Sequence, residues 1–188
     1  MALAKLPETI KCLLENSPGA NIFLGNRSNF ENWLQVELCG KLSGPDINAD
    51  SIEPESSMPR PIEGSIDIVF THKREKYAIE LKLVIASNKK APKNKLKGKP
   101  KNKATSLHPI EMAISKLSHA MNERYYDHSA LILITYPLNN AIEIKKFTEK
   151  LLASEWVKKC CVQDTVKHPT MFSAGANGAI YLLQLCRN

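Results

Sequence analysis

Residues 64–84, GSIDIVFTHKREKYAIELKLV, decide the fold of this chain. They predict two β-strands, over residues 65–70 and 77–85, joined by a short polar turn at 72–75. Both runs are rich in β-branched and aromatic residues, and both alternate with the period of two that a half-buried strand shows. The stretch therefore predicts an antiparallel hairpin.

The register of this hairpin decides which side chains share a face. With the turn centred between Lys73 and Arg74, Asp67 lies directly opposite Glu80. A register shifted by one residue would place the two carboxylates on opposite faces. One face is then wholly apolar and must be core: Ile66, Ile68, Phe70, Tyr77, Ile79, Leu81 and Leu83. The other face carries Asp67, Val69, Ala78, Glu80, Lys82 and Val84.

The two carboxylates on this second face need a positive charge. Directly opposed residues of a strand pair lie roughly 5 Å apart at Cβ, and like charges there are destabilising. Either the Lys82 ammonium or a divalent cation could separate Asp67 from Glu80. Mg²⁺ commonly takes one or two carboxylates together with waters and substrate phosphates. The alternative interpretation is a solvated strand face whose charges carry no function.

A helix precedes the hairpin, and one of its glutamates lies on its apolar side. Ser28 and Glu31 form a capping-box pattern at its start. Glu37 shares a face with the apolar stripe of the helix, which consists of Phe30, Trp33, Leu34 and Leu38. Burying a carboxylate unpaired costs several kcal/mol, so Glu37 needs a partner, a raised pKa or a metal ion. A pair between Glu37 and Lys41 at the rim of the stripe is the alternative.

The remaining elements follow from periodicity and turn residues. Residues 109–125 are predicted to be a helix, with Lys116 and His119 flanking its core face as surface residues or reaching a site at the sheet edge. The apolar run 130–136 is predicted to be a central strand covered on both faces. Further predictions are a helix over 8–16, a loop or edge strand over 45–63, a helix over 142–152, irregular chain over 156–178, and a last strand over 179–186.

The net positive charge of the chain resides in one segment. The chain carries +7, and residues 87–105 contain eight lysines and no acidic residue. Prolines and a glycine interrupt this segment, so we expect a mobile loop. A basic block this dense attracts polyanions, which predicts phosphate binding; a solvated linker without a partner is the alternative. The lysines are Lys89, Lys90, Lys93, Lys95, Lys97, Lys99, Lys101 and Lys103.

Composition predicts one ordinary globular domain over residues 1–188. No apolar run is long enough to span a membrane, and the N-terminus is too polar for a signal peptide. We therefore expect a cytoplasmic protein with no membrane partner. The five cysteines show no C-x-x-C spacing, which favours free thiols over a disulfide framework or a zinc site.

The order of these features resembles the common core of the PD-(D/E)XK nucleases, the restriction-endonuclease-like superfamily. Asp67 on one strand is followed by Glu80-Leu81-Lys82 on the next, after a helix that bears Glu37. The resemblance covers roughly residues 29–137 and rests on three motif residues with loose spacing. It implies an α/β fold with a restriction-endonuclease-like core, in which helices flank a central mixed sheet.

The resemblance also implies a chemistry. The chain would be an Mg²⁺-dependent nuclease, with Mn²⁺ able to substitute, that cleaves DNA as an endonuclease and leaves a 5′-phosphate. Lys82 would position the attacking water or stabilise the charge that develops on the phosphate. The implied metal ligands are Asp67, Glu80, Glu37 and the carbonyl of Leu81. Two departures are that Ile66 replaces the proline of the motif's name, and that the following helix lacks the glutamine pattern of exonuclease-like members.

Other functions remain open at this point. A non-catalytic nucleic-acid-binding domain would use the same lysine-rich segment, with Asp67, Glu80 and Lys82 as a structural charge cluster. An interaction subunit would bind an acidic protein through that segment. For the nuclease, double-stranded DNA is the expected partner, and a homodimer would allow both strands to be cut.

Overall fold

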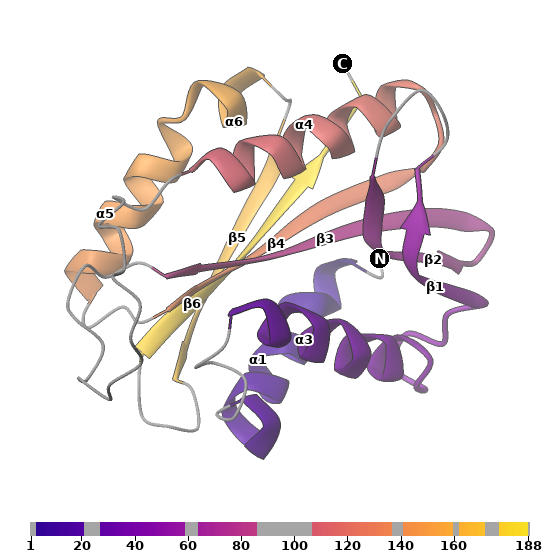
Figure 1. Cartoon of the computed structure of the whole chain (residues 1–188), viewed down its shortest axis with the longest axis horizontal. Helices are drawn as coiled ribbons and strands as arrows, with labels where there is room; N and C mark the ends of the chain where they lie inside the picture. The colour runs from indigo at the N-terminus through magenta and orange to yellow at the C-terminus, as the bar shows by residue number, and fades with distance from the viewer. Residues whose placement is uncertain are drawn as a thin grey trace.

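Helices cover both faces of one mixed β-sheet (Figure 1). The computed structural model describes residues 3–20, 27–58, 64–85, 107–136, 141–159, 162–171 and 177–187. Within these residues, six strands form a single sheet in the order β1-β2-β3-β4-β6-β5. Neighbouring strands are antiparallel except β3 and β4, which run parallel. The prediction of an α/β fold with a helix-flanked mixed sheet is therefore confirmed.

The elements have the following bounds. The strands are β1 (Ser51–Ser57), β2 (Ser65–His72), β3 (Glu75–Ile85), β4 (His128–Tyr136), β5 (Val162–Met171) and β6 (Asn177–Leu185). The helices include the short 3₁₀ helix η1 (Leu3–Lys5), α1 (Leu6–Asn16), α3 (Arg27–Leu42), α4 (His108–Asn122), α5 (Ala141–Leu152) and α6 (Glu155–Lys159).

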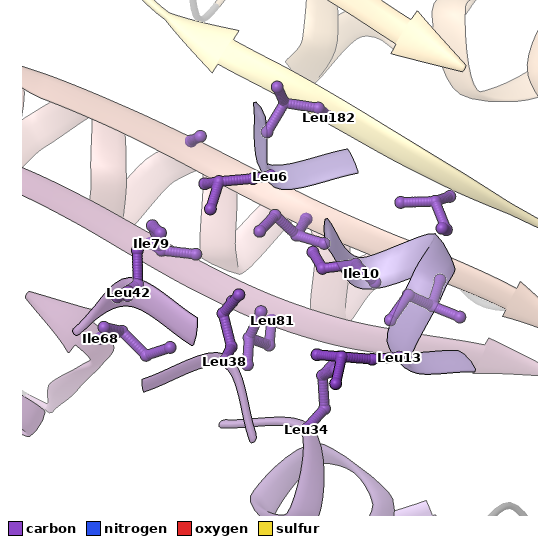
Figure 2. Packing of buried hydrophobic residues seen from close by; sticks show 14 of the residues in the cluster. Leu6, Ile10, Leu13, Leu34, Leu38, Leu42, Ile68, Ile79, Leu81 and Leu182 are labelled. Carbon is purple, nitrogen blue, oxygen red and sulfur yellow. The ribbon is translucent and has the colours of Figure 1, made fainter. Parts of the chain in front are cut away.

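Two hydrophobic layers join the sheet to its helices. On one face, leucines and isoleucines of α1 and α3 pack against β2, β3, β4 and β6 (Figure 2). On the other face, α4, α5 and α6 pack against the same sheet. Because both faces are covered, β4 is buried at every position except its two ends. The predicted central strand is thus confirmed.

The β2–β3 hairpin has the register that the sequence predicts. Lys73 and Arg74 form the turn, both with positive φ (53° and 71°), as a type I′ turn requires. The ladder pairs residues 68–72 with residues 75–79, centred on this turn. The pairing stops at Ile68–Ile79, so the two strands part just before the carboxylates.

A bend in β2 accompanies this parting. In the facing strand β1, Glu55 has a positive φ of 52°, and the β1–β2 register lacks a pair between Glu55 and Asp67. Beyond the bend, Ile66 packs in the layer under α4, whereas Ile68 packs under α3. The prediction that Ile66 shares a face with Ile68 is therefore wrong, because strict alternation holds only while the strand is straight.

The second face of the hairpin is not solvated. Its apolar members all belong to the layer under α4: Val69, Ala78 and Val84. Glu80, between them, is 1% exposed. The interpretation of this face as a solvated strand surface is wrong, because α4 covers it.

Two further predictions are wrong. Irregular chain was expected over 156–178, but α6 and the edge strand β5 lie there. β5 is polar and contains Pro169, which an edge strand tolerates because one of its sides makes no ladder bonds. Cys12 and Cys39 are free thiols as expected, but Cys186 is disulfide-bonded. Sequence spacing does not show which cysteines a fold brings within bonding distance.

The lysine-rich segment 87–105 lies outside the described residues. Its predicted mobility and phosphate binding remain predictions. Among the residues that the structure does describe, no helix is long and apolar enough to cross a membrane.

Candidate active site

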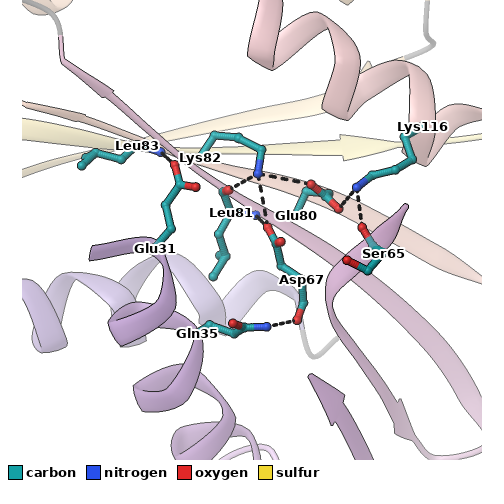
Figure 3. Close-up of polar contacts among 9 residues, drawn as sticks. All are labelled: Glu31, Gln35, Ser65, Asp67, Glu80, Leu81, Lys82, Leu83 and Lys116. Atoms are coloured by element: carbon teal, nitrogen blue, oxygen red, sulfur yellow. Dashed lines mark hydrogen bonds and ion pairs between the residues drawn. The ribbon is translucent and has the colours of Figure 1, made fainter. Parts of the chain in front are cut away.

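The candidate active site forms at the edge of β3, beyond the hairpin ladder (Figure 3). Here β2 no longer supplies backbone partners, and side chains replace them. The backbone N–H of Leu81 donates to Asp67 Oδ2 at 2.7 Å. Two residues along, the N–H of Leu83 donates to Glu31 Oε1 at 2.8 Å. One carboxylate from β2 and one from α3 therefore cover this edge.

Helix α3 also holds Asp67 from the other side. Gln35 lies one helical turn after Glu31, and its amide donates to the backbone carbonyl of Asp67. Gln35 is 7% exposed, so this bond is shielded from water. Because Glu31 contacts β3 and Gln35 contacts β2, one helix fixes both strands at the point where they part.

The Lys82 ammonium lies among three oxygen atoms. Its Nζ is 2.8 Å from the carbonyl oxygen of Leu81, 3.4 Å from Glu80 Oε2 and 3.5 Å from Asp67 Oδ2. The three oxygens therefore surround a single cation position (Figure 3). Two carboxylates and a carbonyl are the kind of hard donors that Mg²⁺ takes.

A second lysine, from α4, holds Glu80. Lys116 Nζ forms an ion pair with Glu80 Oε1 and donates to the carbonyl of Ser65 at 2.6 Å. The Glu80 side chain is 1% exposed, against 22% for Lys116. A carboxylate so deeply buried requires charged partners, since its desolvation costs several kcal/mol. Lys116 is thus a member of the charge cluster rather than a surface residue.

The environment shifts the pKa values of two groups. Burial raises the pKa of Glu80, and the charge of Asp67 raises it further, against the lowering effect of the two lysines. Burial alone would lower the pKa of Lys82, but the surrounding carboxylates outweigh burial and raise it. Asp67 makes the largest of the raising contributions, followed by Glu80 and then Glu31. Lys82 therefore stays a cation at neutral pH.

A cleft opens over this cluster, between α4 and the parting strands. Its volume is about 740 Å³, within the roughly 300–1,000 Å³ range of small-ligand pockets. The strands line it with Ser65, Asp67, Glu80 and Lys82. Helix α4 lines it with Pro109, Met112, Ala113, Ser115, Lys116 and His119. The carboxylates are therefore reachable by a ligand that enters this cleft.

The predicted helical glutamate, Glu37, is not part of the cluster that the structure assembles. Gln35 and Glu37 are two residues apart, which separates them by roughly 200° around the helix axis. Since Gln35 points at Asp67, Glu37 points away from it. The glutamate that α3 brings to the strands is Glu31.

The sequence pattern around Glu31 indicated a helix cap rather than a site residue. Glu31 was expected to complete a capping box with Ser28, but α3 begins at Arg27, so Ser28 lies inside the helix. Glu31 and Gln35 stand four residues apart beside the apolar stripe, and this spacing could have identified both as site residues. For Lys116, the sequence indicated only that it flanks the core face of α4, which is weaker evidence for a site residue.

Four of the other predicted site residues lie together in the structure, and eight are not described. Asp67, Glu80, Leu81 and Lys82 come together as the hairpin register predicts. The eight lysines of the basic segment lie outside the described residues.

The donor set fits a magnesium site that water and substrate complete. Nowhere in the described part of the chain do three His, Cys, Asp or Glu side chains group so that they could hold a metal ion. Asp67 and Glu80 supply two carboxylates, and Leu81 adds a carbonyl. Mg²⁺ usually keeps several waters and uses only one or two carboxylates besides substrate phosphates. The Lys82 ammonium occupies the position between these oxygens, so Mg²⁺ could bind them only if Lys82 moves aside.

Comparison with known proteins gives no family assignment: no protein-family model, no curated protein and no solved structure matches this chain.

Proposed function

We propose that this chain is a Mg²⁺-dependent nuclease with a restriction-endonuclease-like core, which hydrolyses phosphodiester bonds of DNA as an endonuclease. The main support is the arrangement of Asp67, Glu80 and the Leu81 carbonyl around one cation position. These oxygens lie where two strands part, at a cleft large enough for a ligand. The expectation of a 5′-phosphate product comes from the family resemblance alone.

Each strand residue has a role in this proposal. Asp67, Glu80 and the Leu81 carbonyl would hold Mg²⁺, or Mn²⁺ in its place. Bound there, the ion would polarise the scissile phosphate and lower the pKa of the attacking water. Lys82 would stabilise the negative charge that develops on the phosphate in the transition state. Glu31 would act from α3 in the role that the sequence suggested for Glu37.

Two further residues position the reacting groups. Lys116 holds Glu80 Oε1, which leaves Oε2 directed at Lys82. Gln35 holds the backbone of Asp67, and the Asp67 carboxylate in turn bonds to Leu81. The lysine-rich segment would contact the DNA backbone, which adds affinity without sequence choice.

Cleavage of supercoiled plasmid DNA tests the proposal. We expect nicking with Mg²⁺ or Mn²⁺ and none with EDTA. The variant Lys82→Ala should lose about a hundredfold or more in rate, because a transition-state contact is removed. The matched control Lys145→Ala changes a lysine of α5 whose side chain is 77% exposed, and it should cleave like the wild type. Equal cleavage by Lys82→Ala and wild type would overturn the proposal.

A non-catalytic nucleic-acid-binding domain is the second candidate. One observation favours it: Lys82 and Lys116 already balance the charges of Asp67 and Glu80 without any metal. This candidate predicts no cleavage with either metal, together with salt-sensitive DNA binding that is lost when residues 89–103 are deleted. Binding that survives the deletion would contradict it.

A further inference from the structure

The cleft over the carboxylates has an apolar wall and a charged floor. The wall is one face of α4, since Pro109, Met112, Ala113 and Lys116 recur at i, i+3, i+4 and i+7. The first three of these residues are apolar, and Lys116 reaches the floor, where it pairs with Glu80. A ligand in this cleft therefore meets these apolar side chains together with Ser115 and His119 along α4, and charges at the base of the cleft.

The charged groups lie deep, whereas one apolar residue of the wall, Met112, is exposed. Glu80 is 1% exposed and the Lys82 side chain 21%, whereas Met112 is 59% exposed. A phosphodiester that approaches Lys82 must therefore enter the cleft alongside Met112. The part of the nucleotide next to that phosphate, its sugar and base, would then lie against the wall.

The size of the cleft limits what can enter it. Its volume of about 740 Å³ lies within the range of pockets that hold small ligands. A paired base is stacked between its neighbours in a duplex, so it could reach the wall of this cleft only after it unpairs and leaves the stack. A single nucleotide is the size of ligand that pockets of this volume hold.

Met112 has the chemistry to contact a nucleobase. Its flexible, polarizable thioether makes favourable contacts with aromatic rings. It is also one of the few large apolar side chains of the described residues that remain exposed, the others being Val36, Ile142 and Leu152. Of these four, Met112 is the one that lines the cleft. An exposed apolar group beside buried charges suits a ligand with a flat apolar part and an anionic part.

We infer that the cleft binds one unpaired nucleotide, with its base against Met112 and Pro109 and its phosphate at Lys82. The substrate is then single-stranded or locally unwound DNA rather than continuous duplex. This inference rests on the proposed nuclease function and narrows its substrate class.

Cleavage of matched oligonucleotides tests the substrate class. Single strands, and duplexes with an unpaired flap, should be cut about tenfold or more faster than blunt duplex of the same sequence, because the duplex must first unpair. Met112→Ser should slow cleavage of the unpaired substrates about three- to tenfold, whereas Met112→Leu should retain the rate. The control Val36→Ser changes a residue that is 70% exposed on α3, across the sheet from the cleft, and should have no effect.

Binding measured without cleavage separates this inference from the proposed function. A single strand that carries the fluorescent base 2-aminopurine is titrated with protein in Ca²⁺ instead of Mg²⁺. The fluorescence change should saturate, and Met112→Ser should weaken the apparent affinity about three- to tenfold relative to Val36→Ser.

The outcomes are distinguishable. Metal-dependent cleavage that favours blunt duplex, or that Met112→Ser leaves unchanged on single strands, would overturn the inference while the nuclease proposal stands. Binding that depends on Met112 without cleavage of any substrate would support the nucleotide cleft and overturn the nuclease. Absence of both binding and cleavage would overturn both.

Discussion

The Glu80 carboxylate is the least exposed charged group of the candidate active site, and its two lysines explain how the fold tolerates it. A buried charge with no partner would cost several kcal/mol. Lys82 and Lys116 approach different oxygens of the same carboxylate, one from its own strand and one from α4. Replacing any one of the two carboxylates and two lysines of the cluster by a neutral residue would leave the charges of the other three unbalanced. The stability of each charged side chain therefore depends on the others.

Two glutamates of α3 allow a matched test at the residue scale. Glu31→Gln keeps an oxygen that can accept the Leu83 N–H, so the fold should survive while the negative charge is lost. We expect Mg²⁺-dependent cleavage to fall about ten- to a hundredfold, with a higher Mg²⁺ concentration needed for half-maximal rate. Glu37→Gln removes the same charge six residues, about 1.7 turns, further along the helix and should cleave DNA like the wild type.

The two rates should be measured over a Mg²⁺ titration, with thermal unfolding as a check on folding. If Glu37→Gln loses activity and Glu31→Gln does not, then Glu37 is the helical site residue after all. If neither variant changes the rate or the Mg²⁺ requirement, α3 supports the two strands but supplies no carboxylate for metal binding.

The sequence predicts the strand residues of this site better than the helical ones for a geometric reason. Side chains of a strand alternate with a period of two, so one correct register places Asp67, Glu80 and Lys82 on a common face. A helical apolar stripe is about 100° wide, so several positions border it equally well. Glu31 and Glu37 both border the stripe of α3, and only the position of β3 distinguishes them.

Helix α4 ends in a stabilising hydrogen-bond motif, but the position of that motif which favours glycine is occupied by an arginine. The N–H of Tyr125 donates to the Ala120 carbonyl, and the N–H of Arg124 donates to that of Met121. This is the Schellman pattern, which places Arg124 in the left-handed region, at φ 61°. A side chain in that region costs roughly 1 kcal/mol, and glycine avoids the cost.

Arg124→Gly should therefore raise the free energy of unfolding by about 0.5–1 kcal/mol. Glu123→Gly, one residue earlier at φ −77°, should lower it by about the same amount, because there glycine only adds freedom to the unfolded chain. Urea unfolding of the two variants measures both effects. Midpoints that move in the same direction would contradict this account of the helix end.

The elements that the sequence missed have weak patterns. Residues 162–171, VQDTVKHPTM, are polar and include a proline, so nothing in them indicates a strand. Their strand structure comes from pairing with β6 along nearly its whole length. By contrast, the run ALILITY in β4 is apolar enough to be recognised alone, because it is covered on both faces.

In the molecule as a whole, the order of the strands in the sheet differs from their order in the sequence, so the sequence did not predict it. β6 enters between β4 and β5, so the last strand pairs with both. Its Tyr181 is 0% exposed, donates or accepts a hydrogen bond with Thr148 Oγ1 at 2.9 Å, and contacts the ring of Phe147. This tyrosine ties α5 to β6, the strand next to the edge strand β5, so the ionisation of its hydroxyl reports on the packing between α5 and the sheet.

Titration of the tyrosines tests that packing as a whole. Burial raises the pKa of Tyr77, Tyr126 and Tyr181 above the ordinary value; the Glu75 hydrogen bond adds to this at Tyr77, and the Glu53 charge adds to it at Tyr126. Above about pH 10 the unfolded chain releases these protons while the folded chain keeps them. The stability present below that pH must therefore fall as the pH rises further.

We expect the ionisation of Tyr77, Tyr126 and Tyr181 to coincide with loss of the folded circular-dichroism signal at alkaline pH. Tyr181→Phe removes one of the groups whose proton release accompanies unfolding, so its free energy of unfolding should fall less steeply with pH than that of the wild type. In guanidinium Tyr77, Tyr126 and Tyr181 should titrate together near pH 10. Ionisation of these three tyrosines near pH 10 with the fold intact would mean that their hydroxyls reach solvent. The layer under α1 and α3 would then be open at Tyr77, and the layer under α4 and α5 at the other two.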